Sequence, residues 1–291
     1  MPGAELRLIR RRIRTVQSTM KITRAMELIA SSRIVRAQQR VTGGQPYTAR
    51  MREVVGNLSR ASGSVQHPLL AARPLTTAGV LVVASDRGLA GAYNTNVIRL
   101  ADVRLQEHVA AGVACRVYVV GKRALSYFRY RGYNIERSFV GITDAPTYEN
   151  AREVARALMN DYAAETVDSV EAFSTRYLSA MTQTAAMLPL LPVSPPATAE
   201  GQAPIGYSYE GGAPELLARL LPSYVEGAIF GILLDASASE HAARRRAMKA
   251  ATENGEELIR LLNRGANRAR QAEITTEISE IVGGAEALTR G

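Results

Sequence analysis

The residues best placed to carry out chemistry lie in one short segment, Ser85-Asp-Arg-Gly-Leu-Ala-Gly-Ala-Tyr-Asn94. It follows an apolar run, Gly79–Ala84, and precedes helical spacing, which is where α/β proteins often bind phosphate at a helix N-terminus. The segment matches neither G-x-G-x-x-G nor G-x-x-x-x-G-K-[ST]. A serine nucleophile would be expected in G-x-S-x-G, which is absent. The spacing favours a structural turn and leaves a nucleotide site or a small hydrolase as alternatives.

Cysteine and histidine are too few and too scattered for a metal centre. Cys115 is the one cysteine, so the chain has no internal disulfide and no cysteine-rich zinc or iron–sulfur site. The histidines, His67, His108 and His241, have no metal-ligand spacing. We therefore predict no bound metal.

Positive charge is concentrated in the first sixty residues. They carry thirteen basic and three acidic residues, a net charge of +10, against +9 for the whole chain of 291 residues. Such a segment can bind nucleic acid, an acidic membrane or an acidic protein surface, and it is also typical of an organellar transit peptide. No aromatic residue precedes Tyr47, which argues against stacking on single-stranded nucleic acid. No apolar run approaches the roughly 18 to 20 residues that a bilayer requires, so we predict no membrane-spanning segment.

Both ends of the chain have the spacing of long helices. Apolar residues step by three and four residues, as coiled-coil core positions do, in Leu6–Met20, Leu258–Ala272 and Ile274–Leu288. No proline occurs from 223 to 290, whereas Gly43-Gly44-Gln45-Pro46 predicts a break in the first helix. The apolar stripes of the two ends can cover each other by pairing as an antiparallel coiled coil.

Strands and helices alternate in the middle of the chain. The predicted strands are 79–84, 115–120, 134–140 and 169–177, and the predicted helices are 94–109, 122–131 and 148–165. This alternation predicts βαβ units in a Rossmann-like open α/β domain. Seven of the 12 prolines fall between Pro189 and Pro222, which predicts a linker or loop poor in strands.

The expected fold class is therefore α+α/β, with a long antiparallel coiled coil of the N- and C-terminal helices and a central α/β domain. We divide the chain into a first coiled-coil helix over 1–62, the α/β domain over 75–205 and a second coiled-coil helix over 206–291.

Several stretches resemble one family. The sequence from Ile13 to Arg33 resembles the N-terminal helix of the gamma subunit of F-type ATP synthases, and Ala247–Asn254 and Asn267–Ala285 resemble its C-terminal helix. Ser85–Gly91 and Pro146–Asn150 are similar to its central domain. The match covers nearly the whole chain in the family's order. It begins within the first ten residues, which argues against a transit peptide.

The resemblance implies a central rotary shaft of the bacterial type. In the family, proton flow turns a membrane ring of c subunits, and the ring turns the shaft inside a hexamer of alternating alpha and beta subunits. The resemblance further implies contact with the epsilon subunit, no catalytic residue or cofactor of its own, no nucleic acid and no insertion into the membrane. The expected location is peripheral, on the cytoplasmic side of the bacterial cell membrane.

The resemblance also implies three groups of contact residues. Expected to contact or couple to the beta subunit are Lys21, Arg24, Met26, Arg244, Arg270, Gln271 and Thr275. Expected in an apolar bearing near the tip are Ile278, Ile281, Val282 and Leu288. Expected to meet the c-ring and epsilon are Tyr207, Tyr209 and Glu210. The cysteine pair of the plastid redox loop is absent, so no thiol regulation is expected.

Two other functions stay open on the residues alone. A nucleic-acid-binding coiled coil would retain DNA with a steep dependence on salt. A small α/β enzyme using the 85–94 loop would bind nucleotide in calorimetry. Incorporation of the chain into an ATPase-active hexamer of alpha and beta subunits would distinguish the rotor subunit from both.

Overall fold

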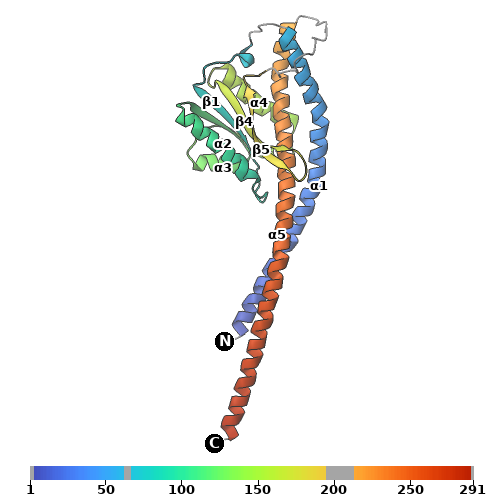
Figure 1. The fold of residues 1–291 in the computed structure, drawn as a ribbon, viewed down its shortest axis with the longest axis vertical. Coiled ribbons are helices and arrows are strands. Elements are labelled where there is room, and N and C mark those ends of the chain that lie inside the picture. Colours follow the sequence, from blue (N-terminus) through green and yellow to red (C-terminus); the bar gives the residue numbers. More distant parts are fainter. Residues whose placement is uncertain (1–2, 62–66, 195–212, 290–291) are drawn as a thin grey trace. The chain divides into compact units, whose positions relative to one another are not determined.

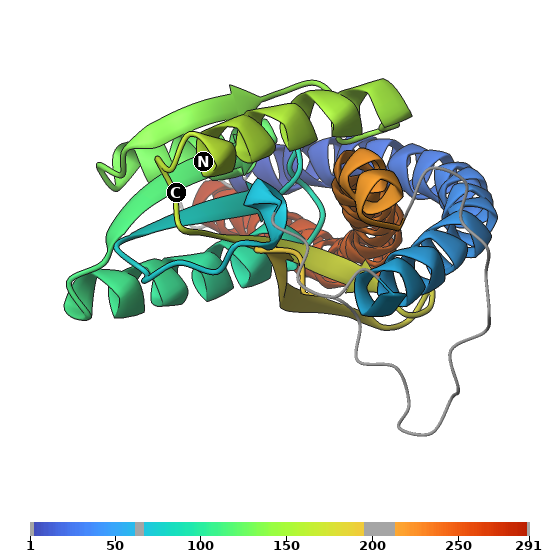
Figure 2. The ribbon, with the colours of Figure 1, turned by 90° about the horizontal axis from the view of Figure 1, so that it is seen from above.

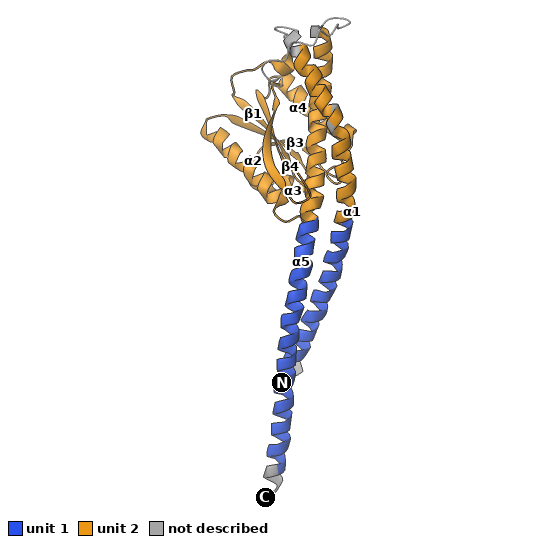
Figure 3. Cartoon of the chain, turned by 45° about the vertical axis from the view of Figure 1, so that its right-hand side comes forward, with its two compact units in different colours: residues 1–29, 245–291 blue, residues 30–244 orange. Residues whose placement is uncertain are grey.

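The computed structural model describes residues 3–61, 67–194 and 213–289. They form two compact units, residues 30–244 and residues 1–29 with 245–291 (Figure 3). We call these the α/β unit and the helical unit. Helices α1 (Gly3–Ala61) and α5 (Ala213–Thr289) each contribute to both.

A five-stranded sheet lies at the centre of the α/β unit (Figure 1). The strands in spatial order are β3 (Ile135–Phe139), β2 (Ala114–Val120), β1 (Thr77–Val83), β4 (Ser169–Tyr177) and β5 (Gln183–Leu191). The first four are parallel, and β5 is antiparallel to β4. Parallel neighbours need crossover connections, and the helices that supply them are α2 (Tyr93–Ala110), α3 (Lys122–Tyr130) and α4 (Tyr148–Ala163). A short 3-10 helix, η1 (Pro68–Leu70), precedes β1.

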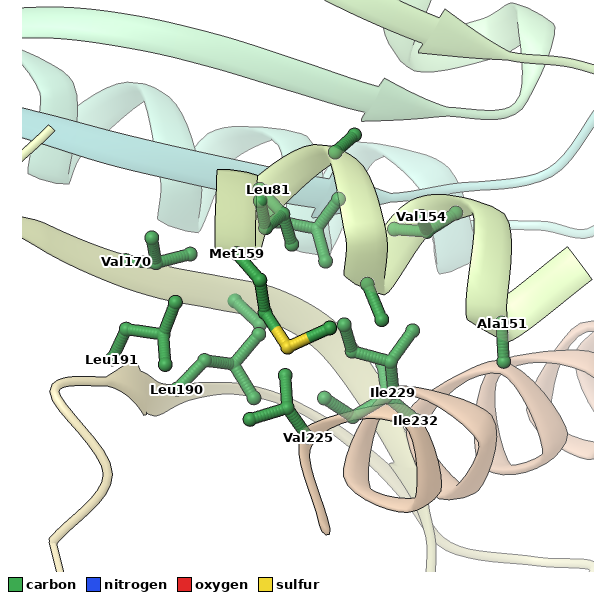
Figure 4. Packing of buried hydrophobic residues seen from close by; sticks show 14 of the residues in the cluster. Leu81, Ala151, Val154, Met159, Val170, Leu190, Leu191, Val225, Ile229 and Ile232 are labelled. Carbon is green, nitrogen blue, oxygen red and sulfur yellow. The ribbon is translucent and has the colours of Figure 1, made fainter. Parts of the chain in front are cut away.

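The two faces of the sheet pack against different helices, because successive side chains of a strand point to opposite faces. Val80 and Val82 of β1 share a core with α2 and α3. Leu81 and Val83 share the other core with α4 and α5. Figure 4 shows this second core, where Met159 of α4 lies among strand residues and residues of α5. The view in Figure 2 likewise places α5 beside the sheet.

Helices α1 and α5 run antiparallel within each unit. In the helical unit Ile9 lies opposite Gly265, and Met20 lies opposite Gly255. In the α/β unit the facing residues are Ala37, Val41, Leu234 and Ala238. Residue numbers rise along α1 while they fall along α5, so the two helices are antiparallel. Together with the central sheet, this confirms the predicted fold class.

The predicted break at Gly43–Pro46 is wrong, because α1 continues through these residues as helix. Proline removes one helical hydrogen bond and disfavours a helix interior by about 3 kcal/mol. Val41 precedes the proline, Val55 and Leu58 follow it, and all three are buried within the α/β unit. Burying one such side chain contributes about 1.5–3 kcal/mol, so packing on both sides outweighs the local preference.

The prediction that 189–222 is a linker poor in strands is wrong at both of its ends. Strand β5 includes Pro189, which is tolerated because β5 is an edge strand. Helix α5 begins at Ala213 and contains Pro222. Leu221 and Val225, on either side of this proline, are buried in the core, and their packing stabilises the helix at the proline. Residues 195–212 lie outside the described residues.

One helix among the described residues, Glu215–Ala285 of α5, passes a length-and-composition test for crossing a membrane. It contains an 18-residue window of mean hydropathy 1.4, of which 39% is buried. This window was not expected from the sequence. Core helices pass the same test, and Leu217, Leu221 and Ile229 of α5 are fully buried in the α/β core. One such helix is weak evidence for a membrane span.

Candidate functional site

The end of α5 carries an exposed apolar stripe. Within the helical unit Ile9 packs near Gly265, and α1 begins at Gly3, so α5 extends beyond the start of α1 from about residue 271. The exposed fractions are 47% for Ile274, 56% for Ile278, 71% for Ile281 and 58% for Val282. Leaving such side chains in water forfeits about 1.5–3 kcal/mol each, and a continuous apolar stripe is typical of a surface that a partner covers.

The remaining surface of this end is acidic. Residues 271–289 contain four glutamates and no basic residue. Thr275 donates its hydroxyl hydrogen to the carbonyl oxygen of Gln271 at 2.9 Å, so this hydroxyl is used within the helix. Arg270 and Gln271 are exposed beside it. Leu288 lies in the described part of the helix, but its side chain is outside the described set.

Helix α1 presents a basic surface in the helical unit. Residues 5–29 contain seven basic and two acidic residues. A shallow groove on this helix is lined by Arg7, Arg10, Arg11, Arg14, Thr15 and Ser18. Lys21 and Arg24 are exposed, and Met26 is half-buried. Like charges at this density repel one another, and a negatively charged partner surface would complement them.

Arg244 lies in a different environment from the other predicted contact residues. It is buried in the α/β unit, where its Nη2 lies 2.5 Å from Oε1 of Glu240, one helical turn earlier. The same nitrogen donates to the carbonyl oxygen of Gly88 at 3.4 Å. Burial raises the pKa of Glu240, and the charge of Arg244 opposes that shift. This arginine therefore has internal partners that join α5 to the 85–94 loop.

The polar residues of the 85–94 loop are also used internally. Ser85 is fully buried, and its backbone N–H donates to Oδ1 of Asn94 at 2.9 Å. Asp86 accepts from the backbone N–H of Lys122 at 3.2 Å and from the hydroxyl of Thr143 at 3.0 Å. These bonds tie the ends of β1, β2 and β3 together, as a structural turn would.

Helix α5 contacts the end of β4 and the start of α2, the helix that follows β1, at the edge where open α/β sheets usually bind ligands. The Ser239 hydroxyl donates to the carbonyl oxygen of Thr175 at 3.3 Å. The Tyr93 hydroxyl donates to the carbonyl oxygen of Ala236 at 3.1 Å. Among the described residues, no group of three or more His, Cys, Asp and Glu side chains could hold a metal ion.

Several polar pairs join segments that are distant in the sequence. The hydroxyls of Thr23 and Thr252 lie 2.7 Å apart in the helical unit, where both residues are buried. Arg33 of α1 forms an ion pair with Asp144 in the α/β unit. Neither pair has a signal in the sequence, whereas the pair of Glu240 and Arg244 within α5 has one, the i, i+4 spacing of opposite charges on a helix. Tyr207, Tyr209 and Glu210 lie outside the described residues.

Comparison with known sequences gives full-length matches. The profile of the family described as ATP synthase matches residues 5–288. A protein of Acidothermus cellulolyticus named ATP synthase gamma chain is 48% identical over 298 residues, which cover 98% of each chain. A protein of Pelotomaculum thermopropionicum with the same name is 41% identical, over 97% of this chain and 99% of that protein.

Comparison with solved structures finds the same fold at low sequence identity. The rotor of the Euglena gracilis mitochondrial ATP synthase matches with a TM-score of 0.65 and 19% identity, over 94% of this chain and 99% of that chain. A chain in the central stalk and c-ring structure of the Tetrahymena thermophila mitochondrial ATP synthase matches with a TM-score of 0.59 and 20% identity, over 79% of this chain and 99% of that chain.

Proposed function

The chain belongs to the ATP synthase gamma-chain family, and from that premise we propose how its surfaces serve a central-stalk rotor. A subunit of this kind is not the catalytic one. It couples rotation of a membrane ring to ATP synthesis or hydrolysis in a hexamer of alpha and beta subunits. The partners are then the alpha, beta and epsilon subunits and the c-ring, and the location is peripheral, on the cytoplasmic side of a bacterial cell membrane.

The observation that carries the proposal is the exposed apolar stripe at the end of α5. Three isoleucines and a valine, Ile274, Ile278, Ile281 and Val282, are exposed on a helix that extends beyond α1. A sleeve of apolar side chains in the head would cover this stripe. In our proposal Ile278, Ile281, Val282 and Leu288 form the bearing in which the shaft turns.

A rotor can act on its neighbours only through contact energies that differ between its sides. The helical unit has such unequal sides. Its α1 surface is strongly basic around Lys21 and Arg24, whereas the end of α5 is acidic and apolar. Turning these surfaces past three beta subunits would stabilise a different conformation in each.

We assign the basic side to the beta subunits. Lys21 and Arg24 would attract an acidic loop of beta, and the half-buried Met26 would pack beneath it. Arg270, Gln271 and Thr275 would contact beta from α5, and Arg244 would couple to this region from the α/β unit. Tyr207, Tyr209 and Glu210 would form the contact with the c-ring and epsilon.

The first experiment is co-expression with the alpha and beta subunits. The chain should co-purify in an ATPase-active hexamer. Replacing Ile278 and Ile281 together by aspartate should weaken its retention several-fold, because two charges would enter an apolar sleeve. The matched control is Val103→Asp, which places a charge on an exposed apolar position of α2. Failure to co-purify would refute the rotor function, and unchanged retention of the double variant would refute the bearing.

The second experiment tests the basic side. Met26→Lys adds a charge beside the proposed acidic loop and should impair coupling more than assembly. ATP-driven proton pumping should therefore fall more than ATP hydrolysis in membranes that carry the variant complex. Equal losses in the two activities would argue against this role for Met26.

A further inference from the structure

A small cavity within the α/β unit is not used by the proposed rotor function. Its volume is about 210 Å³, and it lies between α1, α5 and the loop that precedes α4. Three arginines of α1, Arg33, Arg36 and Arg40, line one side. Asp144 of the loop and His241 of α5 line the other.

The cavity has an excess of positive charge. Spacings of three and four residues place the arginines on one face of α1. Arg33 forms an ion pair with Asp144, which leaves Arg36 and Arg40 without a carboxylate partner among the described residues. Both guanidinium groups belong to exposed residues of the cavity wall, so an ion can reach them from solvent.

The buried histidine in the wall has an unused ring nitrogen. His241 is 2% exposed, and its Nε2 lies 3.2 Å from the carbonyl oxygen of Asp144. The Ser237 hydroxyl donates to the same oxygen at 3.1 Å, so both residues hold the loop against α5. His241 Nδ1 is buried with no partner in the part of the chain that the structure describes. Buried polar atoms are rarely unpaired. Because the Nε2–H donates to the Asp144 carbonyl oxygen, the unpaired Nδ1 is an acceptor, and an anion can satisfy it only through a protonated oxygen such as the O–H of hydrogenphosphate.

We propose that this cavity binds a small oxyanion of the size of inorganic phosphate, with Arg36 and Arg40 as its main ligands. Planar guanidinium groups bind phosphate oxygens through paired, charge-assisted hydrogen bonds. Pockets for drug-sized ligands measure about 300–1,000 Å³, so 210 Å³ is small for a whole nucleotide. A water molecule takes about 30 Å³, which leaves room for one phosphate and several waters. The site does not depend on the proposed rotor function.

The test is calorimetric titration of the full-length chain with inorganic phosphate at constant ionic strength. We expect saturable binding of one phosphate per chain. Arg36→Gln and Arg40→Gln should each weaken it about tenfold, the equivalent of one hydrogen bond to a charged group. Arg36→Lys keeps the charge but loses the paired N–H donors of the guanidinium. Its phosphate affinity should lie between those of the wild type and Arg36→Gln. Circular dichroism of each variant checks that the helices are intact.

The matched control is Arg10→Gln with Arg14→Gln, which removes two exposed arginines from α1 in the helical unit. These changes should leave phosphate affinity within about twofold. Equal weakening by the control and by the cavity variants would mean diffuse attraction to a basic chain and would overturn the site. A titration with ADP distinguishes inorganic phosphate from the phosphate groups of a nucleotide as the ligand. Binding of ADP without binding of inorganic phosphate would also overturn the assignment.

Discussion

Helix α5 lies in two different environments along its length. In the α/β unit most of its residues from Leu217 to His241 are buried or half-buried, and several are part of the domain core. In the helical unit no described residue of α5 after Thr252 is buried. Helix α1 follows the same division, since Leu6 and Thr23 are its only described buried residues in the helical unit.

The difference shows how one continuous helix can serve two purposes. Long helices in proteins owe most of their stability to packing, and the α/β unit supplies that packing through its core. The helical unit has only the narrow seam between α1 and α5. Its remaining apolar surface is therefore available to other subunits, which is what a shaft that works by contact requires.

The largest change in stability is expected at the buried ion pair of Glu240 and Arg244 in the α/β unit. Arg244→Met should destabilise the chain by about 3–5 kcal/mol, because it leaves the buried carboxylate of Glu240 unpaired. Arg245→Met, at the neighbouring half-buried position, should cost less than about 1 kcal/mol. Urea denaturation at pH 8 measures both free energies of unfolding.

The effect of Arg244→Met should also depend on pH. Burial raises the pKa of Glu240, and Arg244 counteracts that shift, so the pKa should rise further in the variant. Protonation then removes the unpaired charge at low pH, and the cost should shrink as the pH falls from 8 toward 5. A cost at pH 8 no larger than that of Arg245→Met would show that the pair does not matter.

The second test substitutes the same residue type at two positions of α5. Ile229 is fully buried in the α/β core, and Ile278 is 56% exposed at the end of the helical unit. Ile229→Ala should lower the free energy of unfolding by about 2–5 kcal/mol through lost burial and a cavity. Ile278→Ala should change it by less than about 0.5 kcal/mol in the isolated chain. Similar costs at both positions would contradict the two environments.

The third test concerns a carboxyl group on the α/β part of α5. Burial raises the pKa of Asp235 from 3.8 to about 6, although Arg176 opposes the shift. The folded state therefore binds a proton more tightly than the unfolded state, and Asp235 makes stability fall as the pH rises from about 4 to 6. Asp235→Asn should abolish this dependence and stabilise the chain at pH 7 by on the order of 1 kcal/mol, since solvent screens part of the effect. Urea denaturation at pH 4.5 and 7 measures it, and an unchanged pH slope would contradict the assignment.

Elements buried on both faces could be predicted from sequence, whereas elements held by distant contacts could not. The apolar run at 79–84 predicted β1, which spans Thr77–Val83, because a central parallel strand needs apolar residues on both sides. Strand β5 was missed because Pro189 and the prolines that follow it indicated a loop, whereas an edge strand tolerates a proline. The continuity of α1 through Pro46 depends on packing that local spacing does not reveal.

The candidate site divides in the same way. The exposed stripe of the α5 end could be predicted as apolar from its spacing, and its exposure follows from where α1 begins. The pair of Arg33 and Asp144 could not be predicted, because 111 residues separate the partners. The burial of Arg244 could not be predicted either, because its partner Gly88 lies 156 residues away in the sequence.

The last and smallest test examines the seam of the helical unit with two glycines of α5. A methyl group added at Gly265 would lie 4.0 Å from Cδ1 of Ile9, an ordinary contact. Gly265→Ala should therefore stabilise the helix by about 0.5–1 kcal/mol through its higher helix propensity. A methyl group at Gly255 would lie 2.5 Å from Cγ of Met20, so Met20 must move, and Gly255→Ala should give no gain or a loss. Thermal unfolding followed by far-ultraviolet circular dichroism measures both variants. Equal gains would show that α1 and α5 are not in close contact at Gly255, and the helical unit would then lack the seam on which the comparison depends.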